Sequence, residues 1–209
     1  MNSKSCWKCK SLIEEFRHFC AECDTIQPPS EENFYKFMRF EKKLGICTAT
    51  LQNRYYELSR KFHPDYYQNK SSQELTFALK YSSILNRAYF TLKNPIARVR
   101  YLMMLEGIHE NRDSGSIPVK FAEDIFEIQD CLMEYKSNPE SHCEDELQNH
   151  HQKLKLDIDE IDQHIHKYFQ NYDASENDKE KLDVLNNISL LLTDRNYLDK
   201  MKTELDGVL

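Results

Sequence analysis

Four of the seven cysteines stand in two close pairs near the start of the chain. Two residues separate Cys6 from Cys9 and Cys20 from Cys23, and about ten residues lie between the pairs. Pairs with this spacing can place four thiolates around one Zn²⁺. Unligated thiols or a thioredoxin-like redox pair are the alternatives, but a redox motif needs only one such pair in a βαβ unit. The sequence therefore predicts one structural zinc ion in a module of residues 1–29, whose folding energy the metal supplies.

The run His63-Pro64-Asp65 is a second feature able to make specific polar contacts. Pro64 lacks a backbone N–H and pushes His63 away from helical geometry, so a helix must end here. An imidazole and a carboxylate then flank a rigid ring in a loop between two helices. This arrangement is typical of a docking tip rather than of a catalytic pocket.

The apolar pattern on each side of this run predicts two amphipathic helices, at about residues 50–62 and 72–93. Ser71 and Glu74 have the spacing of a capping box at the start of the second helix. A further helix is expected to begin at Pro95, because proline suits the first helical position. The tip therefore lies at the end of a helical hairpin.

Three basic residues of the first predicted helix, Arg54, Arg60 and Lys61, lie away from its apolar side. They give this helix a local positive balance within an acidic chain. A basic helix face is most often only a solvated surface. Next to the tip, however, it would attract an acidic partner.

The run from residue 111 to 116, Asn-Arg-Asp-Ser-Gly-Ser, is the clearest break in composition and is interpreted as a domain boundary. Three long amphipathic segments follow it, at about residues 118–136, 143–172 and 176–206. Long helices with short connections predict an antiparallel three-helix bundle. The predicted domains are residues 1–29, 30–110 and 111–209.

Composition and charge exclude several classes of protein. The formal net charge of −7 disfavours a nucleic-acid binder, which needs clustered Lys and Arg against phosphates. No apolar run approaches the roughly 18 residues of a membrane span. The sequence has no Gly-rich phosphate loop, Ser-His-Asp arrangement or paired carboxylates for acid–base chemistry, and four cysteines would close the zinc shell. An enzyme is therefore not expected.

Part of the chain resembles the J-domain of the HscB family, the co-chaperones of iron–sulfur cluster assembly. The residues that carry this resemblance are His63-Pro64-Asp65, Ile84-Leu85-Asn86-Arg87-Ala88-Tyr89, Leu92, Pro95, Arg98 and Tyr101-Leu102. The predicted bundle is similar to the family's C-terminal domain, and the cysteine pattern resembles the zinc-binding extension of its animal mitochondrial members. The resemblance implies an all-α fold with a J-domain hairpin, a C-terminal three-helix bundle and a small N-terminal zinc knuckle.

The resemblance also implies a function and its partners. Family members stimulate the ATPase of a DnaK- or HscA-type chaperone and deliver the scaffold protein IscU to it for iron–sulfur cluster transfer. Two alternatives stay open, a generic J-protein and a zinc-knuckle adaptor, each serving other clients. The oligomeric state is also left open, a weak homodimer included.

Carried over by position, the resemblance assigns two contact surfaces. The chaperone-contacting residues would be His63, Pro64, Asp65, Arg54, Arg60 and Lys61. The scaffold-contacting residues would be Ala122, Glu123, Phe126, Glu127, Asp130, Glu134 and Tyr197. Ala122 and Glu123 stand where the family pattern has larger apolar side chains, so the scaffold contact departs from the pattern there.

Phe126 is the most informative residue of the second surface. The acidic residues around it, such as Glu127 and Asp130, form a stripe along the predicted helix. Such a stripe is usually an ordinary solvated face. An exposed aromatic ring surrounded by charge, however, is typical of an interface anchor.

The remaining cysteines and histidines are interpreted without a metal role. Cys47, Cys131 and Cys143 have no partner at ligand spacing. His18 is expected at the surface, since four thiolates already complete a zinc shell. Surface positions are also expected for the histidines of the acidic helix, which are His142, His150, His151, His164 and His166.

The cysteines and the N-terminal segment give expectations for the compartment. Cysteines in close pairs fit metal binding in a reducing compartment better than a disulfide framework. The segment before Cys6 is too short and polar for a targeting peptide. This favours the cytoplasm, with the mitochondrial matrix as the alternative if an upstream targeting segment has been removed.

Overall fold

The computed structural model describes residues 4–13, 17–30, 33–109, 117–137 and 143–209. They belong to two compact units, Met1–Leu102 and Met103–Leu209. Seven α-helices dominate the described part of the chain, which confirms the predicted all-α class. Each helix in the described ranges is too short or too polar to span a lipid bilayer. The composition break at 111–116 lies outside the described residues, so the predicted domain limits stay a prediction.

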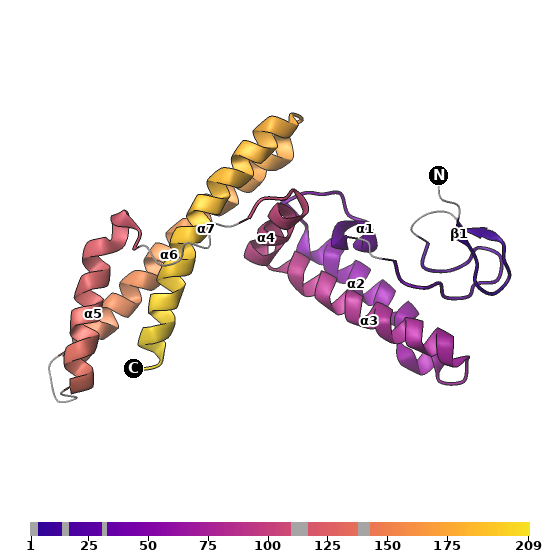
Figure 1. Ribbon diagram of the computed structural model, residues 1–209, viewed down its shortest axis with the longest axis horizontal. Coiled ribbons are helices and arrows are strands. Elements are labelled where there is room, and N and C mark those ends of the chain that lie inside the picture. The colour runs from indigo at the N-terminus through magenta and orange to yellow at the C-terminus, as the bar shows by residue number, and fades with distance from the viewer. Residues whose placement is uncertain (1–3, 14–16, 31–32, 110–116, 138–142) are drawn as a thin grey trace. The chain divides into compact units, whose positions relative to one another are not determined.

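Helices α2 (Thr48–Phe62) and α3 (Ser72–Lys93) form the predicted hairpin and lie side by side in Figure 1. Buried side chains of the two helices are Leu51, Leu58, Phe62, Ala78, Leu85 and Leu92. Burying a large apolar side chain of this kind contributes roughly 1.5–3 kcal/mol. The hairpin is therefore held mainly by its apolar interior.

The tip of the hairpin is set by local sequence. Helix α2 ends at Phe62 because His63 is extended, with φ −61° and ψ 124°. Pro64 then begins a short 3₁₀ helix, Pro64–Tyr67. At the start of α3, the Glu74 N–H donates to Ser71 Oγ at 3.3 Å and the Ser71 N–H donates to Glu74 Oε2 at 3.1 Å. The predicted capping box is thus present.

Two shorter helices follow the same rules, α1 (Phe34–Met38) in the first unit and α4 (Pro95–Leu105), whose residues 103–105 belong to the second unit. The Phe34 ring stacks on Tyr101 of α4 with 4.5 Å between centroids. The Asn94 side chain accepts the Ala97 N–H at 2.9 Å, which caps the start of α4. Gly107, which follows this helix, has a φ of +73°. Glycine adopts this left-handed conformation more readily than other residues do, and it commonly ends helices.

The N-terminal module contains the only strands of the described residues. Strands β1 (Lys4–Ser5) and β2 (Leu12–Ile13) pair antiparallel. A further isolated bridge joins Phe19 and Ile26. Two-residue strands are too short to show alternation of apolar and polar residues, so the sequence pattern does not reveal them.

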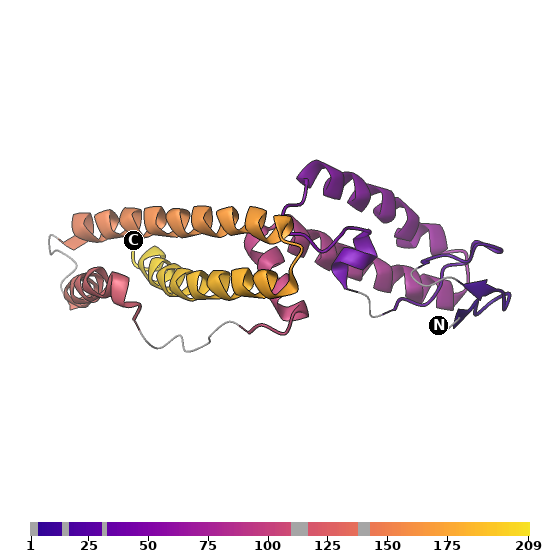
Figure 2. The same cartoon turned by 90° about the horizontal axis from the view of Figure 1, so that it is seen from above.

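The second unit contains three long helices, α5 (Ala122–Ser137), α6 (Cys143–Ala174) and α7 (Asp178–Asp206). Helices α6 and α7 lie side by side in Figure 2 and are joined by a short loop, so they run antiparallel. Helix α6 also packs against α5. The buried residues of the bundle include Ile125, Ile128, Leu147, Leu154, Ile161, Ile165, Leu185, Ile188, Leu192 and Leu198.

Ion pairs at the rim of the bundle join its helices. The Arg195 guanidinium of α7 donates to both carboxylate oxygens of Asp162 of α6, at 2.6 and 3.1 Å. Lys153 Nζ of α6 lies 2.5 Å from Asp124 Oδ1 of α5. These contacts orient the helices but add little to stability where they are exposed.

Candidate functional site

The two cysteine pairs lie in two turns with the same backbone geometry. The Lys10 N–H donates to the Cys6 carbonyl at 3.0 Å, and the Asp24 N–H donates to the Cys20 carbonyl at 3.1 Å. Lys10 and Asp24 are both left-handed, with φ of 65° and 51°. A non-glycine residue in this conformation costs roughly 1–2 kcal/mol. Each cysteine turn therefore holds its last residue at a small conformational cost.

The four sulfur atoms meet between these turns. Cys6 Sγ lies 3.7 Å from Cys23 Sγ, and Cys9 Sγ lies 3.6 Å from Cys20 Sγ. All four sulfurs lie within 4.8 Å of one another. Tetrahedral bonds of about 2.3 Å to one ion require sulfur atoms about 3.8 Å apart. The cluster is therefore compatible with a metal site of the predicted kind.

Hydrogen-bond donors beside Cys6 and Cys20 favour the thiolate form of these two residues, whereas burial and the neighbouring cysteines raise the pKa of Cys23. Cys6 Sγ accepts the N–H groups of Lys8 at 3.4 Å and Cys9 at 3.5 Å. Burial raises the pKa of Cys6, but the two N–H donors outweigh this effect and lower its pKa to about 6. The Ser11 hydroxyl, 3.2 Å from Cys20 Sγ, lowers the pKa of that thiol. Because metals bind the thiolate, the surroundings suit a metal site.

His18 does not lie at the surface, so that prediction is wrong. Its buried ring contacts those of Phe37, Phe62 and Tyr81, with centroids 5.1, 5.3 and 5.2 Å away. Burial, together with the nearby charge of Arg39, lowers the pKa of His18 to about 4, so the ring is neutral at neutral pH. These aromatic partners are far from His18 in the sequence, and local spacing therefore gave no sign of them.

The polar side chains at the tip of the hairpin are exposed, His63 by 52% and Asp65 by 70%. His63 Nδ1 lies 3.5 Å from Asp65 Oδ2 and accepts the Asp65 backbone N–H at 3.4 Å. A neutral imidazole that accepts at Nδ1 carries its proton on Nε2. The tip therefore offers a ring N–H donor and a carboxylate acceptor to a partner.

Two of the basic residues predicted beside the tip share one carboxylate. Lys61 Nζ and Arg54 Nη1 bind Glu57 at 2.8 and 2.6 Å, and they lower the pKa of Glu57 to about 2. Arg54 also donates to the Met38 carbonyl at 3.3 Å. Arg60 is exposed. The positive balance of α2 is thus smaller than the sequence suggests, because Glu57 lies on the same face.

A shallow hollow of about 390 Å³ runs along this face of α2. It is lined by Asn53, Tyr56, Glu57, Arg60 and Lys61. Tyr56 and Tyr66 are both exposed aromatic residues near the tip. Sequence reasoning did not single out either residue. For Tyr56, its position off the apolar stripe of α2 and next to the basic residues was the available signal.

The residues predicted to contact the scaffold lie on α5 and α7. Glu123, Phe126, Glu127, Asp130 and Glu134 of α5 are exposed, Ala122 is half-buried, and Tyr197 of α7 is half-buried. The Phe126 side chain is 56% exposed among the carboxylates, so its predicted exposure is confirmed, while its role as an interface anchor stays a prediction. Met133, seven residues further along α5, is also exposed and was not predicted. Its spacing of seven residues from Phe126 places both on the same face of a helix, and this spacing is visible in the sequence.

Cys131 and Cys143 are buried, which fits the packed positions expected of them, but each has a neighbouring group that chain spacing did not reveal. Their sulfur atoms and a carboxylate oxygen of Glu146 lie within 4.8 Å of one another. Cys131 Sγ lies 3.6 Å from both the Cys143 carbonyl and Glu146 Oε2. The fold brings the end of α5 to the start of α6, which spacing alone does not show. None of the seven cysteines, all of which lie in the described ranges, forms a disulfide.

The histidines of α6 do not form a metal cluster within the described ranges. His151 Nε2 lies 2.7 Å from Asp206 Oδ1 of α7, and His166 Nδ1 lies 2.6 Å from the Asp162 carbonyl. His151 is therefore partly covered rather than at the surface as predicted. His164 is exposed, and His142 lies outside the described residues.

Comparison with known proteins places this geometry in a family. No family model matches the chain. The chain is 34% identical over 141 residues to the iron–sulfur cluster co-chaperone protein HscB of Homo sapiens, a match that covers 65% of this chain and 60% of that relative. It therefore spans less than two thirds of that relative's length.

A bacterial relative and a solved structure extend the match. The co-chaperone protein HscB homolog of Neisseria meningitidis is 31% identical over 126 residues, which cover 58% of this chain and 76% of the relative. The crystal structure of human co-chaperone protein HscB matches 98% of each chain, with 26% identity and a TM-score of 0.75. With this identity, coverage and common fold, the chain belongs to the HscB family of co-chaperones.

Proposed function

We propose that this protein is a co-chaperone of iron–sulfur cluster assembly. It stimulates the ATPase of a DnaK- or HscA-type chaperone and delivers an IscU-type scaffold to it. The observation that carries the proposal is the exposed pair of His63 and Asp65 at the tip of the α2–α3 hairpin. Membership of a family whose human relative is an iron–sulfur cluster co-chaperone supports the class of partner.

The tip acts by recognition, because the chaperone itself hydrolyses ATP. The Asp65 carboxylate accepts a charge-assisted hydrogen bond from a chaperone arginine, a contact worth roughly 1.5–3 kcal/mol. Gln68 Nε2 donates to Asp65 Oδ1 at 3.2 Å and orients this carboxylate. The His63 Nε2–H supplies the donor beside it.

The adjacent face of α2 steers the chaperone to the tip. Arg60 and Lys61 line the shallow hollow there and attract an acidic partner surface. Tyr56, exposed in the same hollow, supplies apolar contact area. Arg54 adds charge to this face while its guanidinium also binds Met38 and Glu57.

The exposed face of α5 holds the scaffold. Phe126 provides a ring that a partner pocket can enclose, and the surrounding carboxylates accept bonds from basic residues of the scaffold. Linking this face and the tip in one chain raises the local concentration of each partner for the other. ATP hydrolysis by the chaperone is thereby coupled to the scaffold.

The metal of the cysteine cluster is Zn²⁺ in this proposal. Cys6, Cys9, Cys20 and Cys23 would hold it and fill all four positions of its shell. A closed shell leaves no site for substrate, so the ion supplies folding energy rather than chemistry.

The variant His63→Gln tests the function. It removes the imidazole from an exposed position, so the melting temperature and helical content should stay unchanged. Stimulation of the ATPase of a purified DnaK-class chaperone should fall about 10- to 100-fold, the loss expected for one hydrogen bond in a charged pair.

A matched control is His164→Gln, which changes an exposed histidine of α6. This control should stimulate the ATPase as the unaltered chain does. Full stimulation by His63→Gln would refute the role assigned to the tip.

A further inference from the structure

Two residues of the N-terminal module, His18 and Phe19, lie beside a cysteine of the cluster and also contact the hairpin. Both directly precede Cys20. The His18 carbonyl accepts the Gln27 N–H at 2.9 Å, and Phe19 pairs with Ile26 in an isolated bridge. The backbone of these two residues is therefore part of the second cysteine turn.

The side chains of the same two residues contact Phe62, the last residue of α2. The Phe19 ring stacks on Phe62, with centroids 5.7 Å apart and 12° between planes. The His18 ring meets Phe62 edge-on at 5.3 Å. Phe62 is fully buried and is followed directly by His63. The second cysteine turn thus supports the residue from which the tip begins.

Phe62 is also held by α3. Its ring stacks on Tyr81 at 4.5 Å, and its carbonyl accepts the Ser82 hydroxyl at 3.0 Å. The Tyr67 hydroxyl donates to the Lys61 carbonyl at 2.9 Å, which links the residues before and after the His63-Pro64-Asp65 run. Without the N-terminal module, the side of Phe62 that two rings of the module cover would meet water.

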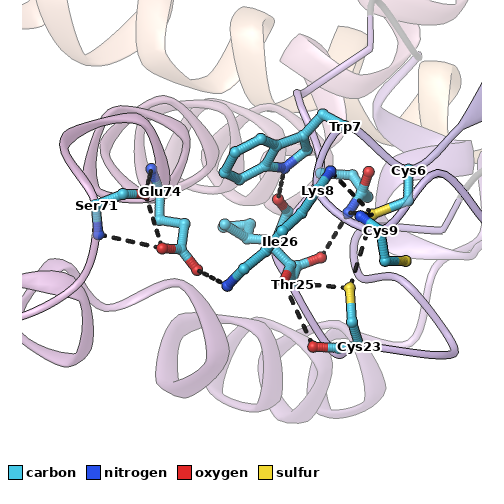
Figure 3. Close-up of polar contacts among 10 residues, drawn as sticks. Cys6, Trp7, Lys8, Cys9, Cys23, Thr25, Ile26, Ser71 and Glu74 are labelled. Carbon is cyan, nitrogen blue, oxygen red and sulfur yellow. Dashed lines mark hydrogen bonds and ion pairs between the residues drawn. The ribbon is translucent and has the colours of Figure 1, made fainter.

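The first cysteine turn contacts the other arm of the tip, the start of α3. Trp7 meets Phe77 edge-on at 6.1 Å, and Lys8 Nζ lies 4.0 Å from Glu74 Oε1. Glu74 is the capping-box residue of α3, and Figure 3 shows Lys8 pointing to it from the module. The Trp7 Nε1–H donates to the Ile26 carbonyl at 2.8 Å, which joins the two cysteine turns.

A buried amide connects the sulfur cluster to this interface. Gln27 Nε2 lies 3.4 Å from Cys6 Sγ and donates to the Thr25 carbonyl at 2.7 Å. The Gln27 backbone N–H is the group that binds His18. The position of the cluster and the position of the rings on Phe62 are therefore coupled through adjacent bonds.

We propose that the tetracysteine module is a brace for the chaperone-contacting tip, and that His18 and Phe19 are the positioning residues through which it acts. The module fixes the end of α2 through Phe62 and the start of α3 through its capping residue. The orientation of the tip residues relative to α2 and α3 then depends on whether the module is folded. This inference rests on the proposed function, because it gives the module a part in presenting the tip to the chaperone.

The variant Phe19→Ala tests the brace, because Phe19 is half-buried and is not one of the cluster cysteines. In the whole metal-loaded chain, the amides of residues 61–70 should exchange hydrogen at least about tenfold faster than in the unaltered chain. The metal content and the exchange rates of α5, α6 and α7 should not change. Chelation of the metal from the unaltered chain should accelerate exchange in the same tip residues.

The chaperone ATPase gives a second readout. Phe19→Ala should raise the half-maximal concentration of the co-chaperone several-fold and leave maximal stimulation nearly unchanged. Without the Phe19 ring, the tip is in its binding-competent conformation for a smaller fraction of the time. Once it binds the chaperone, it makes the same contacts. Phe19→Tyr retains the ring and should restore both readouts. Phe90→Ala removes an exposed ring elsewhere on α3 and should change neither.

Unchanged exchange at the tip in both Phe19→Ala and the chelated chain would overturn the brace, whatever the ATPase assay gives. Faster exchange throughout the bundle would overturn it too, because the effect would then be general unfolding. If the unaltered chain fails to stimulate the ATPase, the exchange experiment still decides the brace. Failure of the proposed function is therefore distinguishable from failure of this inference.

Discussion

Cys47 and Cys131 carry the same thiol group, but their surroundings shift its pKa in opposite directions. Cys47 is exposed just before α2, where hydrogen bonds from Thr50 lower its pKa. Cys131 is buried on α5, where burial and the neighbouring Cys143 raise its pKa to about 12. Since the thiolate is the form that reacts with alkylating agents, both exposure and pKa favour reaction at Cys47.

We expect iodoacetamide to modify Cys47 at least about 100-fold faster than Cys131 near neutral pH. Raising the pH should accelerate reaction at Cys47 first, because its lower pKa gives the thiolate earlier. Peptide mass spectrometry of the metal-loaded chain measures both rates. The buried Cys143 serves as an internal control and should react as slowly as Cys131. Equal rates at Cys47 and Cys131 would contradict the environments described.

At the residue scale, the sequence is informative where partners are close along the chain. The spacing of Cys6 from Cys9, and of Cys20 from Cys23, was enough to predict the cluster. The burial of His18 was not predictable, because its partner rings lie on α1, α2 and α3. Contacts that only tertiary packing creates leave no local spacing to recognise.

At the scale of elements, periodicity and caps predicted the helices well. The capping box of α3 and the proline at the start of α4 set those helix ends by local rules. The two-residue strands β1 and β2 were missed because hydrogen bonding to one partner defines them, not a pattern. Sequence patterns also do not reveal which elements pack together, so the contact between α5 and the start of α6 was not predicted.

Helix α5 presents one exposed face to solvent, and a double substitution on it tests scaffold binding. Phe126→Ala with Glu127→Ala removes the exposed ring and an adjacent carboxylate. Affinity for an IscU-type scaffold should fall by about 2 kcal/mol or more, roughly 30-fold, as expected for an interface anchor. Isothermal titration calorimetry measures the change. Basal stimulation of the chaperone ATPase, without scaffold, should stay unchanged because the tip is intact.

The matched control for this test is Leu156→Ala with Glu160→Ala on α6. Leu156 is 60% exposed, close to the exposure of Phe126, and Glu160 is an exposed carboxylate four residues away. The control should bind the scaffold as the unaltered chain does. Equal affinities of the α5 and α6 variants would place the scaffold elsewhere on the bundle.

In the whole molecule, the proposed tip and scaffold face belong to different compact units of one chain. Their cooperation does not require contact between them, because linkage acts through effective concentration. A chaperone bound at the tip meets the scaffold at a concentration set by the chain rather than by the solution. Linkage of this kind is lost when the two activities are placed on separate molecules.

A mixture of two whole-chain variants tests this property. His63→Gln keeps the α5 face and loses the tip, whereas Phe126→Ala with Glu127→Ala keeps the tip and loses the face. Each molecule of the mixture can hold only one partner. The scaffold concentration needed for half-maximal chaperone ATPase should therefore be at least about tenfold higher than with the unaltered chain. If the mixture matched the unaltered chain, the two sites would act independently and physical linkage would not be the mechanism.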